Sequence, residues 1–436
     1  MLKKAAALGL AFTLLAAPMF ANEGNVPKGV PHLDHVFVVM MENHGYQQVF
    51  ANPNEPYLNG LIESKQVNLA TNYYAIGHPS LTNYLEIVGG SNFGVRSDNS
   101  PAWHDKTCTP NLQSGLVNAD NTAGLATPPV PIEQTNVCPI FGEGMDAATP
   151  AVDNWNEVAL PAFAFLADID GFQSLPAVQT VGKTIADQLD RTGMSWKSYQ
   201  ESLPAGGADG VNNADGFFSN LIPVNSLLPN EAQTLINLYA VKHNPFAYFR
   251  NVQDGNDSDS SLGNMVGFEG AGGMFEDLAS GHVPNYSFIA PNQCNDQHGR
   301  GNAGPQCDFD PNSTGTPYGL NPALIYAGDL TIRNIVKAIH SSPAWQQGKN
   351  AIVIVWDEND YSGIPNPPNG GFPPQNTNRV VLTVETNYGV TGVQSQTYYN
   401  SFSLLKSIEA GFGLPCLNHA CDDNVKVMSD LFGRGQ

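Results

Sequence analysis

Basic residues are scarce in this sequence. It contains 19 Lys and Arg residues against 40 Asp and Glu residues, which gives a formal net charge of -21. Such an excess of negative charge opposes binding to nucleic acid or to an anionic lipid surface through bulk charge. It is compatible with divalent cations. We therefore expect no nucleic-acid partner.

Long apolar runs are missing beyond the first residues. Lys3 and Lys4 precede an apolar run at 5–15, and Pro18 and Ala21 follow it. The run is shorter than the roughly 20 residues that a membrane-crossing helix needs, and its flanks are those of a signal peptide. We expect a signal peptide at residues 1–21, no transmembrane segment, and a mature protein that is periplasmic or secreted.

Cysteines are few, and no two have the C-x-x-C spacing that brings two thiolates onto one zinc ion. In an exported protein, an even number of cysteines favours disulfides over a metal site. The six cysteines lie in three local pairs, so we expect the disulfides Cys108–Cys138, Cys294–Cys307 and Cys416–Cys421. This is one of several possible connectivities.

Residues 22–436 are expected to form one large domain, because open α/β sheets with insertions can reach this length. Stretches rich in Gly, Pro and Asn predict loop insertions at about 97–160, 203–275 and 299–320. One Asp-rich piece, DGNDSDSS at 254–261, loosely resembles a calcium loop. Its Gly and the closing Glu of an EF-hand are out of position, which favours a solvated turn.

The fold class follows from the alternation of two patterns. Continuous apolar runs rich in β-branched residues favour strands covered on both faces. They lie at 35–41, 286–290, 351–356 and 380–384. Helical patterns at 181–193 and 331–340 lie between them. The sequence therefore predicts an α/β domain with a mostly parallel central sheet and helices on both faces.

Acidic residues gather where two of these strands end. Glu42 and Asn43 follow the first strand, and Asp357 and Glu358 follow the third. Ligands of parallel sheets lie outside the carboxyl ends of the strands. Two acidic clusters there repel each other unless a cation lies between them. Any one of these acids alone could cap a helix or face solvent, but the two clusters together favour a metal site.

The stretch GHPSLTNYLEIVGG at 77–90 predicts a helix with Pro79 at its first position and Ser80 in its first turn. The free N–H groups and the dipole at such a helix start favour an anion, either a serine alkoxide or a bound phosphate. A capping serine is the alternative. The stretch lacks G-x-S-x-G, which argues against an ordinary serine esterase.

Two further segments carry polar side chains that suit chemistry. APNQCNDQHG at 290–299 follows a predicted strand and contains Asp296 and His298, while KHNPF at 242–246 contains His243. Such groups can bind a metal or donate a proton. A turn rich in Asn and Asp needs no function, and a single histidine is more often structural than catalytic.

Together these segments resemble a bacterial phosphoesterase family that contains acid phosphatases and phospholipases C, a branch of the alkaline-phosphatase-like superfamily. The matching segments run in order from about residue 35 to 415, and they are VVMMENHGYQQVF, GHPSLTNYLEIVGG, TIADQLDRTGMSWKSYQE, KHNPFAYF, VPNYSFIAPNQCNDQH, GDLTIRNIVKAI, AIVIVWDEND and YNSFSLLKSIEAGFGLP. The resemblance implies an alkaline-phosphatase-like α/β fold with long disulfide-bearing loops.

The resemblance also implies roles for individual residues. Ser80 occupies the nucleophile position, and His298 and His243 are further catalytic candidates. The implied metal ligands are Glu42, Asn43, Asp357 and Glu358, and the implied phosphate contacts are Asn43, Asn83 and Asp296. The metal is a divalent ion whose identity stays open among Zn, Ca, Mg, Mn and Fe.

Two places depart from the family pattern. Many relatives have a histidine in a D-H-V-P-P-like element after the second acidic pair, whereas YSGIPNPPNGGFPPQ at 361–375 has none. A histidine also often precedes the final helix, where this chain has Asn400. Both departures favour a single-metal site, or one completed by other ligands, over a full two-metal site.

The predicted function is metal-dependent hydrolysis of phosphate esters through a phosphoserine at Ser80. The missing histidine slightly favours an acid-phosphatase-like phosphomonoesterase over a phospholipase C. Phe217, Phe218, Phe246 and Tyr248 could form an apolar lip for a lipid, although core packing explains most aromatic residues. A secreted, non-catalytic protein with a structural calcium is the competing class, and a sulfatase or nucleotide phosphodiesterase is a further enzyme candidate.

Overall fold

The structure of this chain is a computed structural model. It describes residues 23–77, 79–95, 98–102, 137–145, 178–204, 208–212, 238–255, 260–301, 303–311, 316–359 and 378–433. Several features of the sequence analysis lie outside these residues: the expected signal peptide, Cys108, Phe217, Phe218 and the stretch at 361–375. The loop expected at 203–275 lies partly within them.

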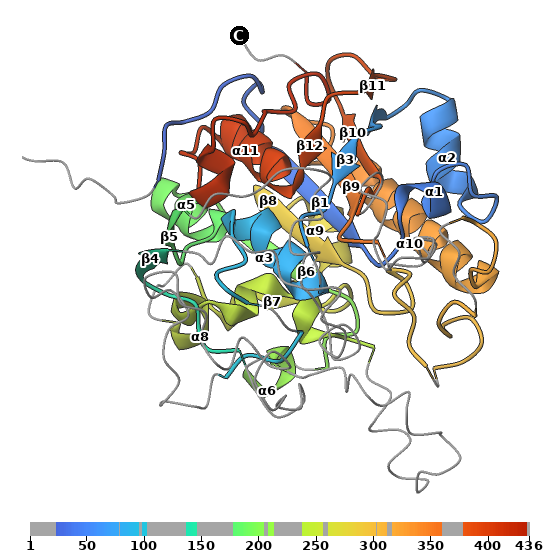
Figure 1. The fold of residues 1–436 in the computed structure, drawn as a ribbon, viewed down its shortest axis with the longest axis horizontal. Coiled ribbons are helices and arrows are strands. Elements are labelled where there is room, and N and C mark those ends of the chain that lie inside the picture. The colour runs from blue at the N-terminus through green and yellow to red at the C-terminus, as the bar shows by residue number, and fades with distance from the viewer. Residues whose placement is uncertain are drawn as a thin grey trace, which may run out of the picture.

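A central eight-stranded sheet organises the fold, in the order β11-β2-β10-β9-β1-β8-β6-β7 (Figure 1). The strands are β1 (His35–Met41), β2 (Asn68–Ala70), β6 (Trp196–Gln200), β7 (Met265–Val266), β8 (Tyr286–Ala290), β9 (Asn350–Trp356), β10 (Leu382–Thr386) and β11 (Gln394–Ser395). β1 runs parallel to both of its neighbours, β8 and β9. The predicted mostly parallel sheet is therefore confirmed.

One predicted strand differs in bounds and direction. The run at 380–384 forms β10 only from Leu382 onward, and β10 is antiparallel to both β9 and β2. Burial does not distinguish an antiparallel strand from a parallel one here, because β10 is buried almost as completely as β1.

Helices pack against both faces of the sheet. The α-helices are α1 (Tyr46–Val49), α2 (Pro56–Glu63), α3 (Ser80–Gly89), α5 (Ile185–Thr192), α6 (Ala208–Val211), α8 (Arg250–Asp254), α9 (Met274–Ser280), α10 (Pro322–Ser341) and α11 (Ser401–Phe412). The short 3-10 helices are η6 (Val241–His243), η7 (Pro245–Tyr248), η8 (Leu262–Asn264) and η9 (Asn418–Cys421). α3 packs against α5 and α11, whereas α10 packs against α2 and α9 (Figure 1).

Two small sheets border the main one. β3 (Tyr73–Tyr74) pairs with β12 (Tyr399–Asn400), and β4 (Glu143–Met145) pairs with β5 (Gln179–Val181). The helix predicted at 181–193 is thus shorter than expected, because Val181 ends a strand. Thr184 caps α5 by accepting the N–H of Ala186, and Gly193 ends it with a φ of 73°.

The N-terminus of α2 is capped from a distant part of the chain. Asp329, buried in α10, accepts hydrogen bonds of 2.9 Å from the backbone N–H groups of Tyr57 and Leu58. This carboxylate also lies at the positive end of the helix dipole, so it stabilises α2 and joins it to α10.

We expect Asp329→Ala to lower the free energy of unfolding by about 1–3 kcal/mol, because two buried N–H groups lose their acceptor. Urea unfolding followed by circular dichroism measures this loss. Asp329→Asn keeps an acceptor oxygen at the same place, so it should recover most of the stability. Equal stability of the Ala variant and the unchanged protein would contradict the capping role.

Two of the expected disulfides are present. Cys294 bonds to Cys307 and Cys416 bonds to Cys421, with Cα–Cα distances of 4.8 Å and 5.2 Å. The first closes a loop that contains His298. The third expected pair, Cys108–Cys138, includes a residue outside the described part of the chain.

Two aromatic residues expected at a lipid-binding lip lie in the core instead. Phe246 and Tyr248 are 0% and 1% exposed. The Phe246 ring packs against Trp196 and Phe288, with centroid distances of 4.6 Å and 5.8 Å. These side chains therefore present no surface to a lipid, and the core-packing alternative holds for both.

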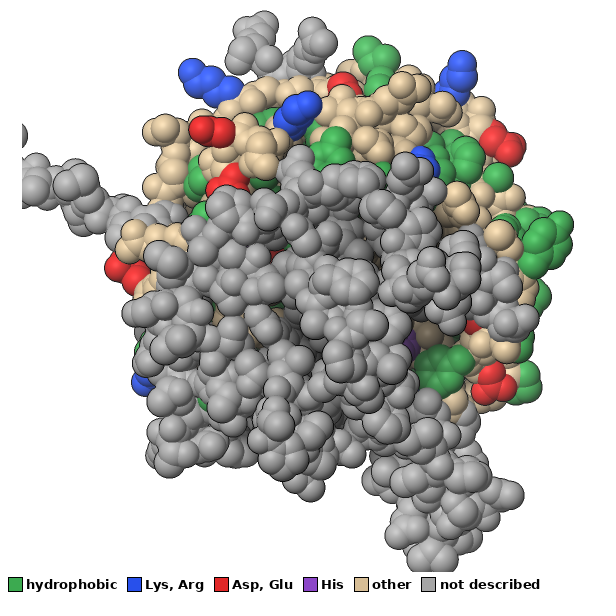
Figure 2. All heavy atoms as spheres, viewed as in Figure 1, with side chains coloured by type: hydrophobic (Ala, Val, Ile, Leu, Met, Phe, Trp, Pro, Cys, Tyr) green, Lys and Arg blue, Asp and Glu red, His purple; other side chains and the backbone are tan. Residues whose placement is uncertain are grey.

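The exposed large apolar side chains are dispersed among the described residues. Those with the greatest exposure are Val26, Phe309, Tyr318, Tyr326 and Val390. On the face shown in Figure 2, apolar side chains of the described residues occur singly or in small groups between acidic and basic ones. Among the same residues, no helix is long and apolar enough to cross a membrane.

Candidate active site

The two acidic clusters leave the sheet side by side. Met41 and Trp356 are register partners at the ends of β1 and β9, so Glu42 and Asp357 are the next residues on adjacent parallel strands. Both carboxylates are fully buried. The backbone N–H of Asn43 donates to Asp357 Oδ1 at 3.1 Å, and Asn43 adopts a φ of 54°, which Asn tolerates better than most residues.

The hydroxyl of Ser80 faces both acidic clusters. Ser80 is the first residue of α3 and is 1% exposed. Its Oγ lies 3.1 Å from Glu42 Oε2 and 3.1 Å from Glu358 Oε1, and since a hydroxyl has one proton it donates to one carboxylate at a time. Pro79 is the N-cap rather than the first helical residue, so the helix starts one residue later than predicted.

Asn83 lies one turn further along α3 and fixes its surroundings. Its Nδ2 donates to Glu358 Oε2 at 3.1 Å and to the carbonyl of Gly77 at 2.8 Å. Its Oδ1 accepts from the backbone N–H groups of Ile76 and Gly77. Asn83 thus holds Glu358 and the turn before Ser80, and its expected contact with phosphate remains a prediction.

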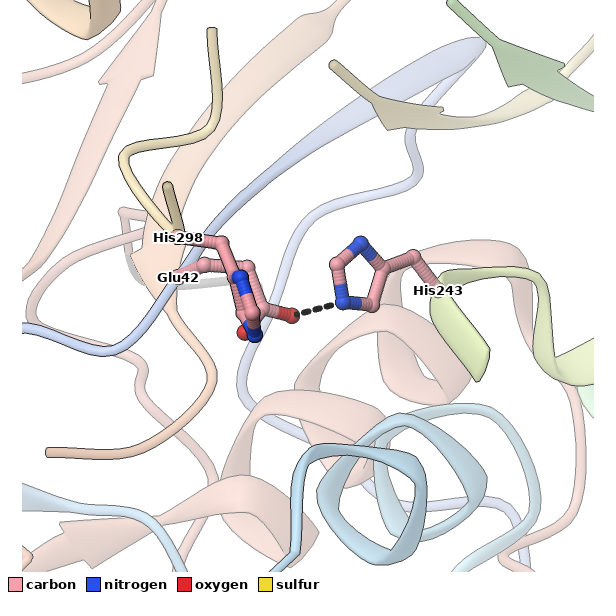
Figure 3. A group of neighbouring side chains, drawn as sticks. All are labelled: Glu42, His243 and His298. Atoms are coloured by element: carbon pink, nitrogen blue, oxygen red, sulfur yellow. Dashed lines mark ion pairs between the residues drawn. The ribbon is translucent and has the colours of Figure 1, made fainter. Parts of the chain in front are cut away.

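His243 lies between two buried carboxylates, of which Figure 3 shows the contact with Glu42. Its Nε2 lies 3.1 Å from Glu42 Oε1, and its Nδ1 lies 3.2 Å from Asp296 Oδ2. The ring stacks on Tyr84 of α3, with centroids 5.3 Å apart and planes at 8°. The segment KHNPF therefore contributes directly to the cluster that includes the acid after β1.

His298 completes this side of the cluster. Its Nδ1 lies 2.7 Å from the carbonyl of Gly299, which assigns the proton to Nδ1 and leaves Nε2 as an acceptor. That Nε2 lies 3.1 Å from Lys242 Nζ. The backbone N–H of His298 donates to Asp296 Oδ1 at 2.7 Å. Figure 3 shows the side chains of Glu42, His243 and His298 converging on one small space.

The backbone that places Asp296 and His298 is held by the residue between them. Gln297 adopts a φ of 79° and is fully buried. Its Oε1 accepts the indole N–H of Trp356 at 3.1 Å, and its Nε2 donates to Glu55 and to the carbonyl of Ile325. These contacts tie the turn to the end of β9, directly before Asp357.

Burial dominates the electrostatics of the site. It raises the pKa of Glu42 well above the ordinary value, and the negative charge of Asp357 adds to the effect. The pKa of Asp357 is raised by burial and then by Glu358, and that of Asp296 by burial and then by Glu42. Burial and then the charge of Lys242 lower the pKa of His243 and of His298. These shifts favour the uncharged forms of the carboxyl groups and of the histidines, and a bound cation would favour the ionised carboxylates instead.

The residues present fit a divalent metal ion. Among the described side chains, the buried atoms Glu42 Oε1, Asp296 Oδ2 and His243 Nε2 have contacts at 3.1–3.2 Å that lack hydrogen-bond geometry, and the buried Asp357 Oδ2 accepts no hydrogen bond. Buried carboxylates in this state are costly unless they are paired or bind a metal. Glu42, His243 and His298 also offer ligand atoms within 4.8 Å of one another. The histidines are thus candidate ligands, a role that the sequence offered for the segment containing His298 as an alternative to proton donation.

Two residues that the sequence did not single out contact the site. Lys242 contacts His298 and lies 3.0 Å from Asp98 Oδ2. Asp98 Oδ1 accepts the N–H of Leu81, the residue after Ser80. Lys242 could have been identified from the sequence, because it stands beside His243 in KHNPF. Asp98 belongs to no motif, so only the fold reveals it.

Two other polar residues have structural contacts. His44, which the sequence left without a role, places Nδ1 3.0 Å from the carbonyl of Glu42 and Nε2 2.9 Å from Asp310 Oδ2. Asn400, which stands where relatives often have a histidine, caps α11 by accepting the N–H of Ser403. Both side chains fix the segments around the site.

Comparison with known proteins identifies the family. The family model described as "Phosphoesterase family" matches residues 50–306 and 321–415. The chain belongs to the Phosphoesterase family. The expected phosphoesterase is therefore confirmed at the level of the family.

The relatives include several phosphatases. An acid phosphatase of Aspergillus fumigatus is 24% identical over 390 residues, covering 89% of this chain and 57% of that protein. A probable acid phosphatase of Kluyveromyces lactis is 23% identical, covering 89% of this chain and 61% of that protein. A phosphatidylinositol-3-phosphatase of Mycobacterium tuberculosis is 29% identical over 132 residues, covering 29% of this chain and 43% of that protein.

The chain spans about three-fifths of the length of the fungal relatives that match most of it. Because those relatives are fungal, the bacterial branch named in the sequence resemblance is not confirmed. A solved structure of an alkaline phosphatase superfamily protein from Vibrio parahaemolyticus aligns with a TM-score of 0.42 and 11% identity, covering 92% of this chain and 72% of that one.

Proposed function

We propose that the chain hydrolyses phosphomonoesters through a phosphoserine intermediate on Ser80. One observation carries the proposal: a buried serine hydroxyl at the start of a helix faces carboxylates from two acidic clusters, at 3.1 Å each. Membership of a phosphoesterase family and the acid phosphatase relatives support the same chemistry.

The first step forms the phosphoserine. Ser80 Oγ attacks phosphorus in line, so a Ser80 O–P bond forms as the ester P–O bond breaks. The hydroxyl proton passes to the carboxylate of Glu42 or Glu358, which already accept it as a hydrogen bond. The positive end of the α3 helix dipole favours the negative charge on the phosphoryl oxygens.

The second step restores the enzyme. A water molecule attacks phosphorus and gives one proton to the histidine that protonated the alcohol, the Ser80 O–P bond breaks, and the serine oxygen takes its proton back from the carboxyl group as hydrogen phosphate leaves. His298 or His243 supplies the proton that the alcohol needs in the first step. Both histidines are neutral in the free site, so a bound phosphate dianion is needed to favour their protonated forms.

Glu42, Asn43, Asp357 and Glu358 would hold a divalent metal ion, with His243 and His298 as alternative partners of Glu42. When bound, such an ion lowers the pKa of a nearby hydroxyl and offsets the charge of the phosphoryl group. Oxygen ligands suit Ca, Mg and Mn, whereas a set that includes imidazole suits Zn or Fe.

One experiment tests the function and separates it from phospholipase C activity. Turnover of p-nitrophenyl phosphate, bis(p-nitrophenyl) phosphate and phosphatidylcholine is compared, each with chelator and with divalent ions restored. We expect the monoester to be the best substrate and chelator to stop its turnover. Faster cleavage of phosphatidylcholine would favour the alternative, a phospholipase C. Inactivity on all three substrates would reject an enzyme of this class.

We also propose that the protein acts after export, in the periplasm or outside the cell. The disulfides Cys294–Cys307 and Cys416–Cys421 support this, because such bonds persist in oxidising compartments. Cell fractionation of the full-length chain tests it. Activity confined to the cytosol would contradict export.

A further inference from the structure

A buried lysine lies at the edge of the candidate active site. Lys242 of η6 is 3% exposed. Its Nζ lies 3.0 Å from Asp98 Oδ2 and 3.1 Å from His298 Nε2. Lysine is rarely buried to this degree unless it has a specific charged partner or a function.

The contacts of Lys242 place its ammonium group between the two halves of the site. On one side, Asp98 also accepts the N–H of Leu81, so the ion pair rests on the first turn of α3 beside Ser80. On the other side, His298 belongs to the cluster with Glu42 and His243. Through Asp98 the positive charge is linked to the residue that follows Ser80, and through His298 it is linked to the histidine and carboxylate cluster.

The charge of Lys242 is also unusual for its surroundings. The hydrogen bond from His298 Nδ1 to the carbonyl of Gly299 leaves the lone pair of Nε2 as the group that faces the Lys242 ammonium. A neutral imidazole is a weaker partner for an ammonium group than an anionic oxygen. An incoming phosphate can thus replace His298 as a partner of Lys242 with a gain in free energy.

We propose that Lys242 contacts a non-bridging oxygen of the bound phosphate and gives the site its preference for phosphomonoesters over phosphodiesters. The proposal rests on the proposed function. A monoester carries close to two negative charges near neutral pH, whereas a diester carries one, so a fixed cation favours the monoester. The competing explanation is a purely structural ion pair that joins η6 to α3 through Asp98.

Lys242→Met tests the proposal by removing the charge while keeping most of the side-chain volume. We expect kcat/KM for p-nitrophenyl phosphate to fall about 100-fold, and that for bis(p-nitrophenyl) phosphate about 10-fold or less. The Kd of inorganic phosphate, measured by isothermal titration, should rise about 10-fold or more. Lys242→Arg keeps the charge and should restore most of the phosphate affinity.

Lys197→Met is the matched control. Lys197 of β6 is paired with Asp277 and donates to the carbonyl of Gly272, and it contacts none of the site residues. This variant should leave the ratio of monoester to diester turnover unchanged. Thermal unfolding of each variant shows whether the fold is intact.

Asp98→Asn distinguishes the two explanations even if Lys242→Met fails to fold. It removes the charged partner of Lys242 but keeps the ammonium group and an acceptor for Leu81 N–H. The proposal predicts phosphate affinity that is kept or increased, whereas a structural ion pair predicts a loss. Loss in Asp98→Asn, or an unchanged ratio in a folded Lys242→Met variant, would overturn the proposal.

The phosphate titration also separates this proposal from the proposed function. If the unchanged protein turns over neither ester, the proposed function fails. Lys242 is then still tested, because phosphate binding that depends on residue 242 supports it and binding that does not depend on it rejects it.

Discussion

Ser80→Ala is expected to abolish phosphomonoester turnover, with a fall in kcat on the order of 10⁴-fold or more. The variant removes the one oxygen that faces both Glu42 and Glu358, while the rest of the site keeps its contacts. Steady-state kinetics with p-nitrophenyl phosphate measures the loss. Rapid acid quenching followed by mass spectrometry should detect phosphate on Ser80 in the unchanged protein and none in the variant.

Ser407→Ala is a suitable control for this experiment. Ser407 is also a buried helical serine, but its hydroxyl donates to the carbonyl of Ser403 and accepts the N–H of Met428. Its loss should lower stability slightly and leave turnover within about 2-fold of the starting value. Full turnover by Ser80→Ala would show that the nucleophile is another group, such as an activated water molecule.

Metal removal is expected to have the second largest effect. Chelator should stop turnover and lower the melting temperature, because Glu42, Asp357 and Glu358 then repel one another in a buried space. A ligand at 100 times its Kd stabilises a fold by about 2.7 kcal/mol, so the shift is measurable by differential scanning calorimetry. Restoring Zn, Mn, Mg, Ca or Fe one at a time should recover both properties with one preferred ion.

Asp357→Asn gives the matching genetic test. In the presence of chelator this variant should melt at a higher temperature than the unchanged protein, since one buried negative charge is gone. It should also lose most of the stabilisation by metal and most of the turnover. Glu63→Gln, at the exposed end of α2, is the control that removes one charge without changing either response.

The two measurements together distinguish the classes of function. A shift in melting temperature without any turnover would indicate a protein that only binds a metal. Turnover that is insensitive to chelator, with no shift, would rule out the metal-dependent site. These two outcomes can be told apart because melting temperature and turnover are measured separately for each variant.

The sequence predicted the parts of the site that follow from local order along the chain. Glu42 and Asp357 each follow an apolar strand, and adjacent parallel strands bring their carboxyl ends together. Ser80 follows Pro79 at the start of a helical pattern, so its place in a first turn was also predictable. These predictions depend on few long-range contacts.

The sequence could not predict contacts that arise only when distant segments pack. Asp98 reaches Lys242 from a loop without a motif. The sequence did not single out Gln297, yet its side chain joins Trp356 to Glu55. Aromatic residues posed a different problem, because the sequence alone does not distinguish a phenylalanine in the core, such as Phe246, from one at a membrane surface. Only burial decides between the two.

The position of β1 in the sheet has a consequence for biosynthesis. Its neighbour β9 begins at Asn350, more than 300 residues after β1 begins at His35. A growing chain therefore carries Ser80 and Glu42 long before Asp357 and Glu358 have been made. Since domains generally fold as units, the proposed site is not assembled in the unfinished polypeptide. Under the proposed function, the hydrolase therefore lacks a complete site until β9 and the acids after it have been made.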